Sequence, residues 1–244
     1  MARATSLLQR SEQPVYTSKQ TEHYVGESSM TEIGRVERPE AEPFRAERKL
    51  YLVPLAYSPK EPPADYVGIL TRYWNGASEH VRRLEDRIGS VRRVYHESVP
   101  VGGAEGLKVV EQLNARSHDL ATQKVEAGAT FEALEDAELL AESFDWQRCL
   151  MIGLASQKAS GQVWASYRES TRLRYEHMAQ RIDETLQAGE AGLLIIREDH
   201  SLQFPQGIQV FYVAPPALDE VHRWIRDHAQ AKDAPQGEDA EGRT

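Results

Sequence analysis

Apolar and polar positions along the chain form short and long blocks, and these predict strands that alternate with helices. The short blocks are apolar, β-prone runs, which are typical of strands in a buried sheet. They cover residues 50–57, 91–99, 192–196 and 208–213. Because Pro54 cannot donate a hydrogen bond to a neighbouring strand, the first run is expected to be an edge strand or to end near that residue.

The long blocks repeat apolar residues every three or four positions, which predicts amphipathic helices. They cover residues 65–88, 105–126, 131–156, 161–188 and 218–231. A strand, a helix and a further strand in succession favour parallel pairing with right-handed crossovers. The sequence therefore predicts an α/β fold with a small, mostly parallel, four-stranded sheet and a large helical layer.

The order of these blocks divides the chain into one folded region and two tails. Residues 48–231 are expected to form the α/β domain. Three consecutive helical blocks over about 105–188 are expected to form an insertion or arm, which suits a dimer contact. Residues 1–47 and 232–244 lack a periodic apolar face, which predicts disordered tails. A docking segment is the alternative for the N-terminal one.

The apolar run over 192–196 leads directly into a cluster of ionisable groups. This cluster consists of Arg197, Glu198, Asp199 and His200. Open α/β sheets bind their ligands at the carboxyl ends of the strands. The end of this strand is therefore the expected position of a site.

Four ionisable residues are candidate catalytic groups. They are Glu97, Arg174, Glu176 and His200. The helix that carries Arg174 and Glu176 precedes the strand 192–196, so it runs antiparallel to it and returns to the same edge of the sheet. A histidine with two carboxylates can hold a metal ion or transfer protons, and an arginine can bind an anion through two hydrogen bonds. The alternative is structural, with solvated ion pairs on the helix and a histidine that caps a strand.

Two neighbouring sets of polar residues are expected to stay outside this site. His96 should point away from Glu97, since consecutive strand residues face opposite sides of a sheet. An acidic string in the third helical block has no histidine one turn away and is expected to be a solvated face. It consists of Glu135, Asp136, Glu138, Glu142 and Asp145.

Composition narrows the classes of partner and leaves the cofactor unidentified. The formal net charge of −9 makes a nucleic-acid partner unlikely, because binding to phosphates needs a basic surface. The single cysteine, Cys149, allows no internal disulfide and no multi-cysteine metal site. No apolar stretch approaches the roughly 20 residues that span a bilayer. The expectation is a cytoplasmic protein that binds a protein partner or forms a homo-oligomer, with no membrane contact.

One segment resembles a known superfamily. Arg174, Met178 and Ala179, followed by the strand 192–196 and then His200, are similar to the closing part of the TraB, Tiki, ChaN and erythromycin-esterase-like proteins. The resemblance implies a hydrolase whose metal, where one is used, is held partly by histidines. The superfamily's opening Gly-Thr-x-His motif has no counterpart in this chain. Arg197 stands where its closing motif has glycine.

These observations favour two functions and suggest a third. The first is a hydrolase-like α/β protein of the TraB and erythromycin-esterase type, metal-dependent or metal-independent. The alternative is a non-catalytic interaction or scaffold protein that uses its long helices and N-terminal tail for self-association or partner binding. The order of a helix, an apolar strand and a second strand near the C-terminus suggests a ribosome-associated, release-factor-like domain, but the acidic charge opposes it.

Overall fold

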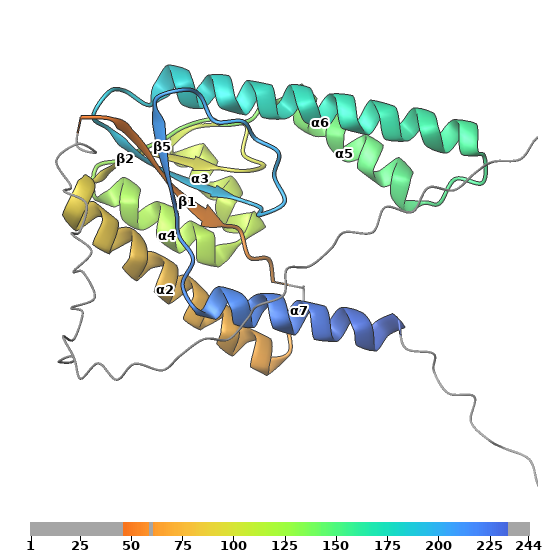
Figure 1. Ribbon diagram of the computed structural model, residues 1–244, viewed down its shortest axis with the longest axis horizontal. Helices are drawn as coiled ribbons and strands as arrows, with labels where there is room; N and C mark the ends of the chain where they lie inside the picture. Colours follow the sequence, from red (N-terminus) through yellow and green to blue (C-terminus); the bar gives the residue numbers. More distant parts are fainter. Residues whose placement is uncertain (1–45, 59–60, 234–244) are drawn as a thin grey trace, which may run out of the picture. The chain divides into compact units, whose positions relative to one another are not determined.

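The computed structural model describes residues 46–58 and 61–233 of the chain, and Figure 1 shows their arrangement. Within these residues the secondary structure alternates between strands and helices. The elements are β1 (Arg48–Pro54), α2 (Ala64–Ile88), β2 (Val91–His96), α3 (Gly103–Leu113), α4 (Ala115–Glu126), β3 (Thr130–Phe131), α5 (Ala137–Met151), α6 (Gln157–Thr185), β4 (Ala191–Ile196), β5 (Ile208–Tyr212) and α7 (Ala217–Asp233).

The strands form one parallel sheet in the order β3-β2-β4-β1-β5. This confirms the predicted α/β class and the parallel pairing. The predicted number of four strands is wrong, because the sheet has five. The additional strand is β3, Thr130–Phe131, whose two residues are too few to give a periodic signal, and Phe131 was assigned to a helix.

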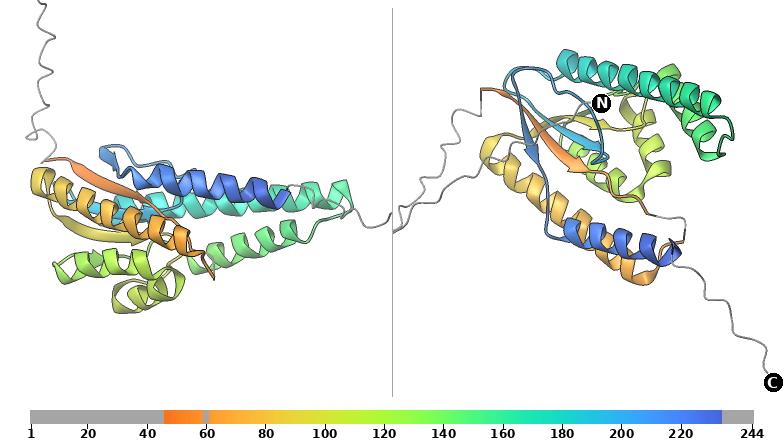
Figure 2. Two further views of the ribbon diagram at one scale, coloured as in Figure 1. Left: turned by 90° about the horizontal axis from the view of Figure 1, so that it is seen from below. Right: turned by 45° about the vertical axis from the view of Figure 1, so that its right-hand side comes forward.

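Helices cover both faces of the sheet (Figures 1 and 2), and the strand residues alternate between two cores. Tyr51 and Leu193 pack in the core under α2, α3, α4 and α7, with Val53 and Ile195. Leu50, Leu52, Leu194 and Ile196 pack in the core under α6. Because β1 and β4 are covered on both sides, both read as continuous apolar runs.

Strand β1 ends at Pro54. This confirms the prediction that the strand either ends near the proline or lies at an edge, by the first of these alternatives. It is not an edge strand, since β4 pairs with it on one side and β5 on the other. The proline closes the strand, and the next residue, Leu55, resumes the ladder by donating to the carbonyl of Ile196 at 2.8 Å. The Tyr73 hydroxyl donates to the Pro54 carbonyl from α2. The missing donor therefore costs the sheet little.

The helices within residues 105–188 begin and end at other residues than predicted, because polar side chains cap them. Asn114 divides the predicted helix 105–126 into α3 and α4, and its side chain accepts the backbone N–H groups of Arg116 and Ser117 at 3.1 Å each. Asp136 caps α5 and Ser156 caps α6 in the same way. These caps satisfy backbone donors that the first helical turn leaves unpaired.

The predicted tails, residues 1–47 and 232–244, lie almost entirely outside the described residues, so their disorder stays a prediction. Helix α7 continues to Asp233, slightly past the predicted end of the domain. Among the described residues, no helix is both long and apolar enough to cross a membrane.

Burial of β4 predicts that Ile195→Asp unfolds the protein. Ile195 is 0% exposed in the central strand, so an aspartate there would be an unpaired buried charge that costs at least about 3 kcal/mol. Urea unfolding followed by circular dichroism measures the loss. The matched control is Val210→Asp on edge strand β5, where the side chain is 39% exposed, and it should change stability little. Equal stability of the two variants would refute the role of β4 as the central buried strand.

Candidate functional site

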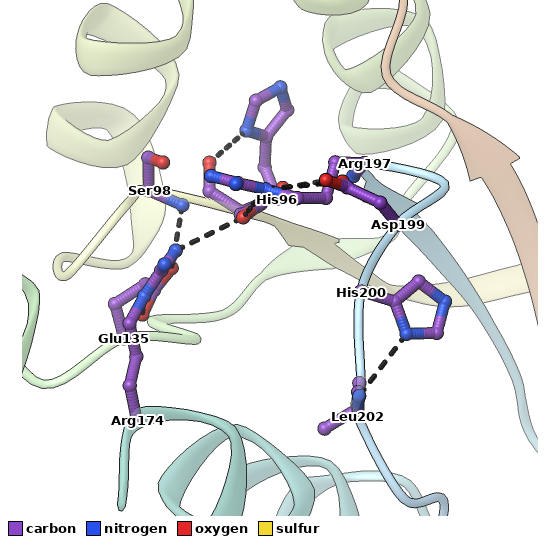
Figure 3. A network of polar contacts seen from close by, with 9 residues as sticks. His96, Ser98, Glu135, Arg174, Arg197, Asp199, His200 and Leu202 are labelled. Atoms are coloured by element: carbon purple, nitrogen blue, oxygen red, sulfur yellow. Dashed lines mark hydrogen bonds and ion pairs between the residues drawn. The ribbon is translucent and has the colours of Figure 1, made fainter. Parts of the chain in front are cut away.

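Charged residues from three strand ends gather at the carboxyl edge of the sheet, beneath α6 (Figure 3). Glu97 follows β2, Glu135 follows β3 and Arg197 follows β4. Arg174 reaches the same place from α6, which packs on this face of the sheet. Parallel strands end at a common edge, which explains why residues so far apart in sequence meet here.

Arg174 lies between two buried carboxylates. Its Nε donates to Oε2 of Glu135 at 2.7 Å and its Nη2 donates to Oε1 of Glu135 at 2.5 Å. Nη2 also lies 3.2 Å from Oε1 of Glu97. The side chain of Arg174 is 3% exposed and those of both glutamates are 0% exposed. Burial disfavours the charge of Arg174, but the two glutamates hold its pKa above the ordinary arginine value.

Backbone groups and a second arginine complete this cluster. The Arg197 N–H donates to Oε2 of Glu97 at 2.9 Å, and Nε of the same residue donates to Oε1 at 2.7 Å. The Ser98 N–H donates to Oε1 of Glu135 at 2.8 Å, with Ser98 at a φ of 68°. Two carboxylates and two guanidinium groups balance in charge, and every carboxylate oxygen has a donor. This arrangement suits a structural clamp better than a proton-transfer group.

His96 and Ser117 form a second buried pair on the other face of the sheet, as the strand alternation predicts. Nδ1 of His96 lies 2.6 Å from the Glu97 carbonyl oxygen, which can only accept, so Nδ1 carries the proton. Nε2 lies 2.9 Å from the Ser117 hydroxyl oxygen, whose one proton is shared between Nε2 and the Asn114 carbonyl at 3.0 Å. The two residues are 1% and 0% exposed, so a substrate cannot reach them. Burial lowers the pKa of His96 to about 4.

Of the four predicted site residues, only Glu97 and Arg174 contact one another. Glu176 is exposed and pairs with Arg172 along the surface of α6. Nδ1 of His200 accepts the N–H of Leu202 at 3.3 Å, and Figure 3 shows the ring turned away from Arg174. Partial burial lowers the pKa of His200, which favours the neutral ring. The structure therefore divides the predicted group into a buried ion pair, a surface ion pair and a loop histidine.

Sequence reasoning missed two members of the cluster, Glu135 and Arg197. Glu135 was assigned to a solvated acidic helix face, but it precedes α5 and is 4% exposed. Arg197 belongs to the ionisable cluster expected to mark the site, but it was not among the four candidate catalytic groups. A usable signal was present, because Arg197 directly follows β4 and Glu135 lies a few residues after β3, at the edge where ligands bind.

A pocket of about 280 Å³ lies beside the cluster, between α6 and residues 201–203. Tyr175 lines it and is 7% exposed. Thr171 also lines it, and its Oγ1 atom is buried without a hydrogen-bond partner in the described part of the chain. Among residues 46–58 and 61–233, no group of three or more histidine, cysteine, aspartate or glutamate side chains is placed to hold a metal ion.

Comparisons of the chain with protein-family models, curated proteins and solved structures found no match. The resemblance to the TraB and erythromycin-esterase-like proteins therefore stays a prediction.

The buried ion pairs predict that Arg174→Met destabilises the fold. The substitution leaves Glu135 without its main partner and Glu97 with one arginine in place of two, which should cost about 3–5 kcal/mol. The matched control is Arg172→Met on the same helix, which removes only exposed ion pairs and should change stability little. Urea midpoints at pH 7 measure both. Equal losses for the two variants would contradict a structural role for Arg174.

Burial of neutral His96 predicts a loss of stability in acid. Its pKa is about 4 in the folded protein and 6.5 in an ordinary environment, so the unfolded chain binds a proton first as the pH falls. Stability from this residue is complete above pH 6.5 and declines towards pH 4, by about 3 kcal/mol. Urea unfolding at both pH values should show a smaller decline for His96→Gln, which cannot titrate. Identical declines would show that His96 protonation contributes nothing.

Proposed function

We propose that this chain is a self-associating interaction protein, and that residues 137–170 form the contact between two copies. These residues, called the arm below, comprise α5 and the first half of α6. The two helices pack against each other, and the turn that joins them lies away from the sheet (Figures 1 and 2). This proposal develops the interaction alternative that the sequence left open.

The arm contains too small a core to be stable in water by itself. Only Leu140 and Ser143 are buried in α5, and the first buried residue of α6 is Ser170. Helices of this length depend on the packing of an apolar face, since forming and holding an isolated helix is unfavourable. An additional surface that covers the arm would supply this packing.

Exposed apolar side chains are concentrated on the arm, and this is the observation that carries the proposal. Met151 is 79% exposed and Ile152 is 74% exposed, whereas no other exposed large hydrophobic side chain in the described chain exceeds 50%. Trp164 adds a ring that is 49% exposed. Clusters of such residues commonly mark interfaces.

A second copy of the chain suits this surface because the arm is nearly neutral. The whole chain has a net charge of −9, but the arm has four acidic and three basic side chains, a net charge of −1. They are Glu138, Glu142, Asp145 and Glu169, with Arg148, Lys158 and Arg168. Two arms therefore repel each other little, and two helical hairpins related by a two-fold axis can form a four-helix bundle.

Hydrolysis, the other function that the sequence suggested, has less geometric support. A hydrolytic site needs a group that can accept a proton or hold a metal ion near the substrate. Both oxygens of Glu97 are occupied by arginine donors, and Glu176 is paired on the surface. His200 lies at the same edge of the sheet but hydrogen-bonds to no carboxylate or arginine in the described chain.

The proposal predicts that the full-length protein is a dimer and that Met151→Asp combined with Ile152→Asp makes it a monomer. Two desolvated carboxylates in a symmetric interface would oppose association strongly. Light scattering coupled to size-exclusion chromatography measures the mass, and circular dichroism checks the fold. The matched control is Leu113→Asp at the end of α3, where a 47% exposed side chain lies outside the arm. A monomeric parent protein, or equal dissociation by the control, would refute the proposal.

A further inference from the structure

We propose that Arg197, Tyr57 and Tyr175 bind the anionic group of a small organic acid, a carboxylate or a phosphate ester, at the carboxyl edge of the sheet. Tyr57 follows β1, Arg197 follows β4, and Tyr175 reaches this edge from α6. The three anion-binding residues lie outside the arm, and the neighbouring pocket adjoins the arm through Tyr167 and Arg168.

The backbone N–H and Nε of Arg197 are bonded to Glu97, and its two terminal amino groups can bind a ligand. Glu97 accepts from both its backbone N–H and its Nε, at 2.9 and 2.7 Å, which fixes the base of the guanidinium group. Neither terminal amino group hydrogen-bonds to any described residue, and the side chain is 27% exposed. A guanidinium with two available amino groups matches the paired oxygens of a carboxylate or phosphate.

The two tyrosines can supply further donors to the same anion. Tyr175 is 7% exposed, yet its hydroxyl has no hydrogen-bond partner among the described residues. Tyr57 is half exposed, and its hydroxyl is likewise unbonded to the described chain. Burial raises the pKa of Tyr175 to about 12 and also raises that of Tyr57, with Glu97 adding to both effects. Both hydroxyls therefore keep their protons and can donate near neutral pH.

Contacts around Glu97 and the strand ends bring the three residues to one place. Leu55, two residues before Tyr57, donates to the carbonyl of Ile196, the residue before Arg197, at 2.8 Å. Tyr175 follows Arg174, whose Nη2 lies 3.2 Å from the Glu97 oxygen that also accepts from Arg197 Nε at 2.7 Å. Neighbouring Arg174 cannot take the role that the sequence suggested for it, because its donors are directed at Glu135 and Glu97. The anion-binding arginine is therefore Arg197.

The topology places this site where parallel sheets bind ligands. The chain leaves β1 towards the face covered by α2, whereas residues 197–207 leave β4 over the other face, where Leu202 joins the core under α6. Adjacent strands whose connections diverge in this way leave a crevice at their carboxyl ends. Arg197 and Tyr57 follow those two strands.

The nearby pocket indicates what the rest of the ligand is. Tyr175 belongs both to the anion site and to the lining of the 280 Å³ pocket between α6 and residues 201–203. That pocket also contains the methyl group of Ala179 and the ring of Tyr167. A ligand held by its anionic group can therefore place an aromatic or aliphatic part in the pocket.

Asp199 is the internal competitor for Arg197. Its Oδ1 lies 3.9 Å from Nε of Arg197, and its side chain is 84% exposed (Figure 3). This distance is too long for a hydrogen bond, so the aspartate contributes repulsion to an entering anion rather than a closed pair. Removal of its charge should therefore strengthen anion binding.

The test is an NMR titration of the full-length protein with benzoate, phenyl phosphate, acetate and inorganic phosphate at constant ionic strength, with chloride as reference. Binding of benzoate or phenyl phosphate should be tighter than that of acetate or inorganic phosphate, because only the aromatic probes fill the pocket. The tighter aromatic probe identifies the preferred anionic group. Equal, weak effects of all five anions would overturn the proposal.

Variants separate a built site from general charge effects. Arg197→Gln should weaken binding by about tenfold or more, and Tyr175→Phe by about threefold, from the loss of one charge-assisted and one weaker hydrogen bond. Asp199→Asn should strengthen it, which no loss of folding can imitate. Arg226→Gln, the control, removes an exposed arginine from α7 and should leave the affinity unchanged. The proposal fails if Asp199→Asn has no effect or if the control weakens binding as much as Arg197→Gln.

Discussion

The guanidinium group of Arg174 is the interaction on which the carboxyl edge of this fold depends. It joins α6 to the segments that follow β2 and β3, through Glu97 and Glu135. Each carboxylate is buried, so each would be strongly unfavourable without a cation beside it. The packing of α6 on this face of the sheet therefore requires that Arg174 pairs with both Glu97 and Glu135.

The sequence predicted the elements that carry an apolar pattern over many residues. It did not predict the elements or boundaries that depend on one or two side chains. The apolar run of β4 and the periodic face of α2 are set by burial, which leaves a pattern over many residues. Strand β3 has only two residues, and the start of α5 is fixed by Asp136, whose side chain accepts two backbone N–H groups. Glu135, one residue before this cap, looked like one more member of an acidic helix face.

The candidate site was predictable as far as topology determines it. Glu97 and Arg174 were placed together because a strand end and an antiparallel helix meet at one edge. Arg174 and Glu176 cannot share that position, since residues two apart on a helix point in nearly opposite directions. His200 is separated from β4 by a turn that reverses the direction of the chain, which no residue pattern encoded.

Helix α6 is much longer than the strand that it precedes, and this difference has a mechanical consequence. Its 29 residues extend about 43 Å, whereas the six residues of β4 extend about 20 Å. The C-terminal half is anchored on the sheet, and Arg174 is the last charged anchor before the helix leaves it. The Arg174 ion pairs hold α6 at the point where it leaves the sheet. A force on the N-terminal end of α6, next to α5, would therefore act on Glu97 and, through Glu97, on Arg197.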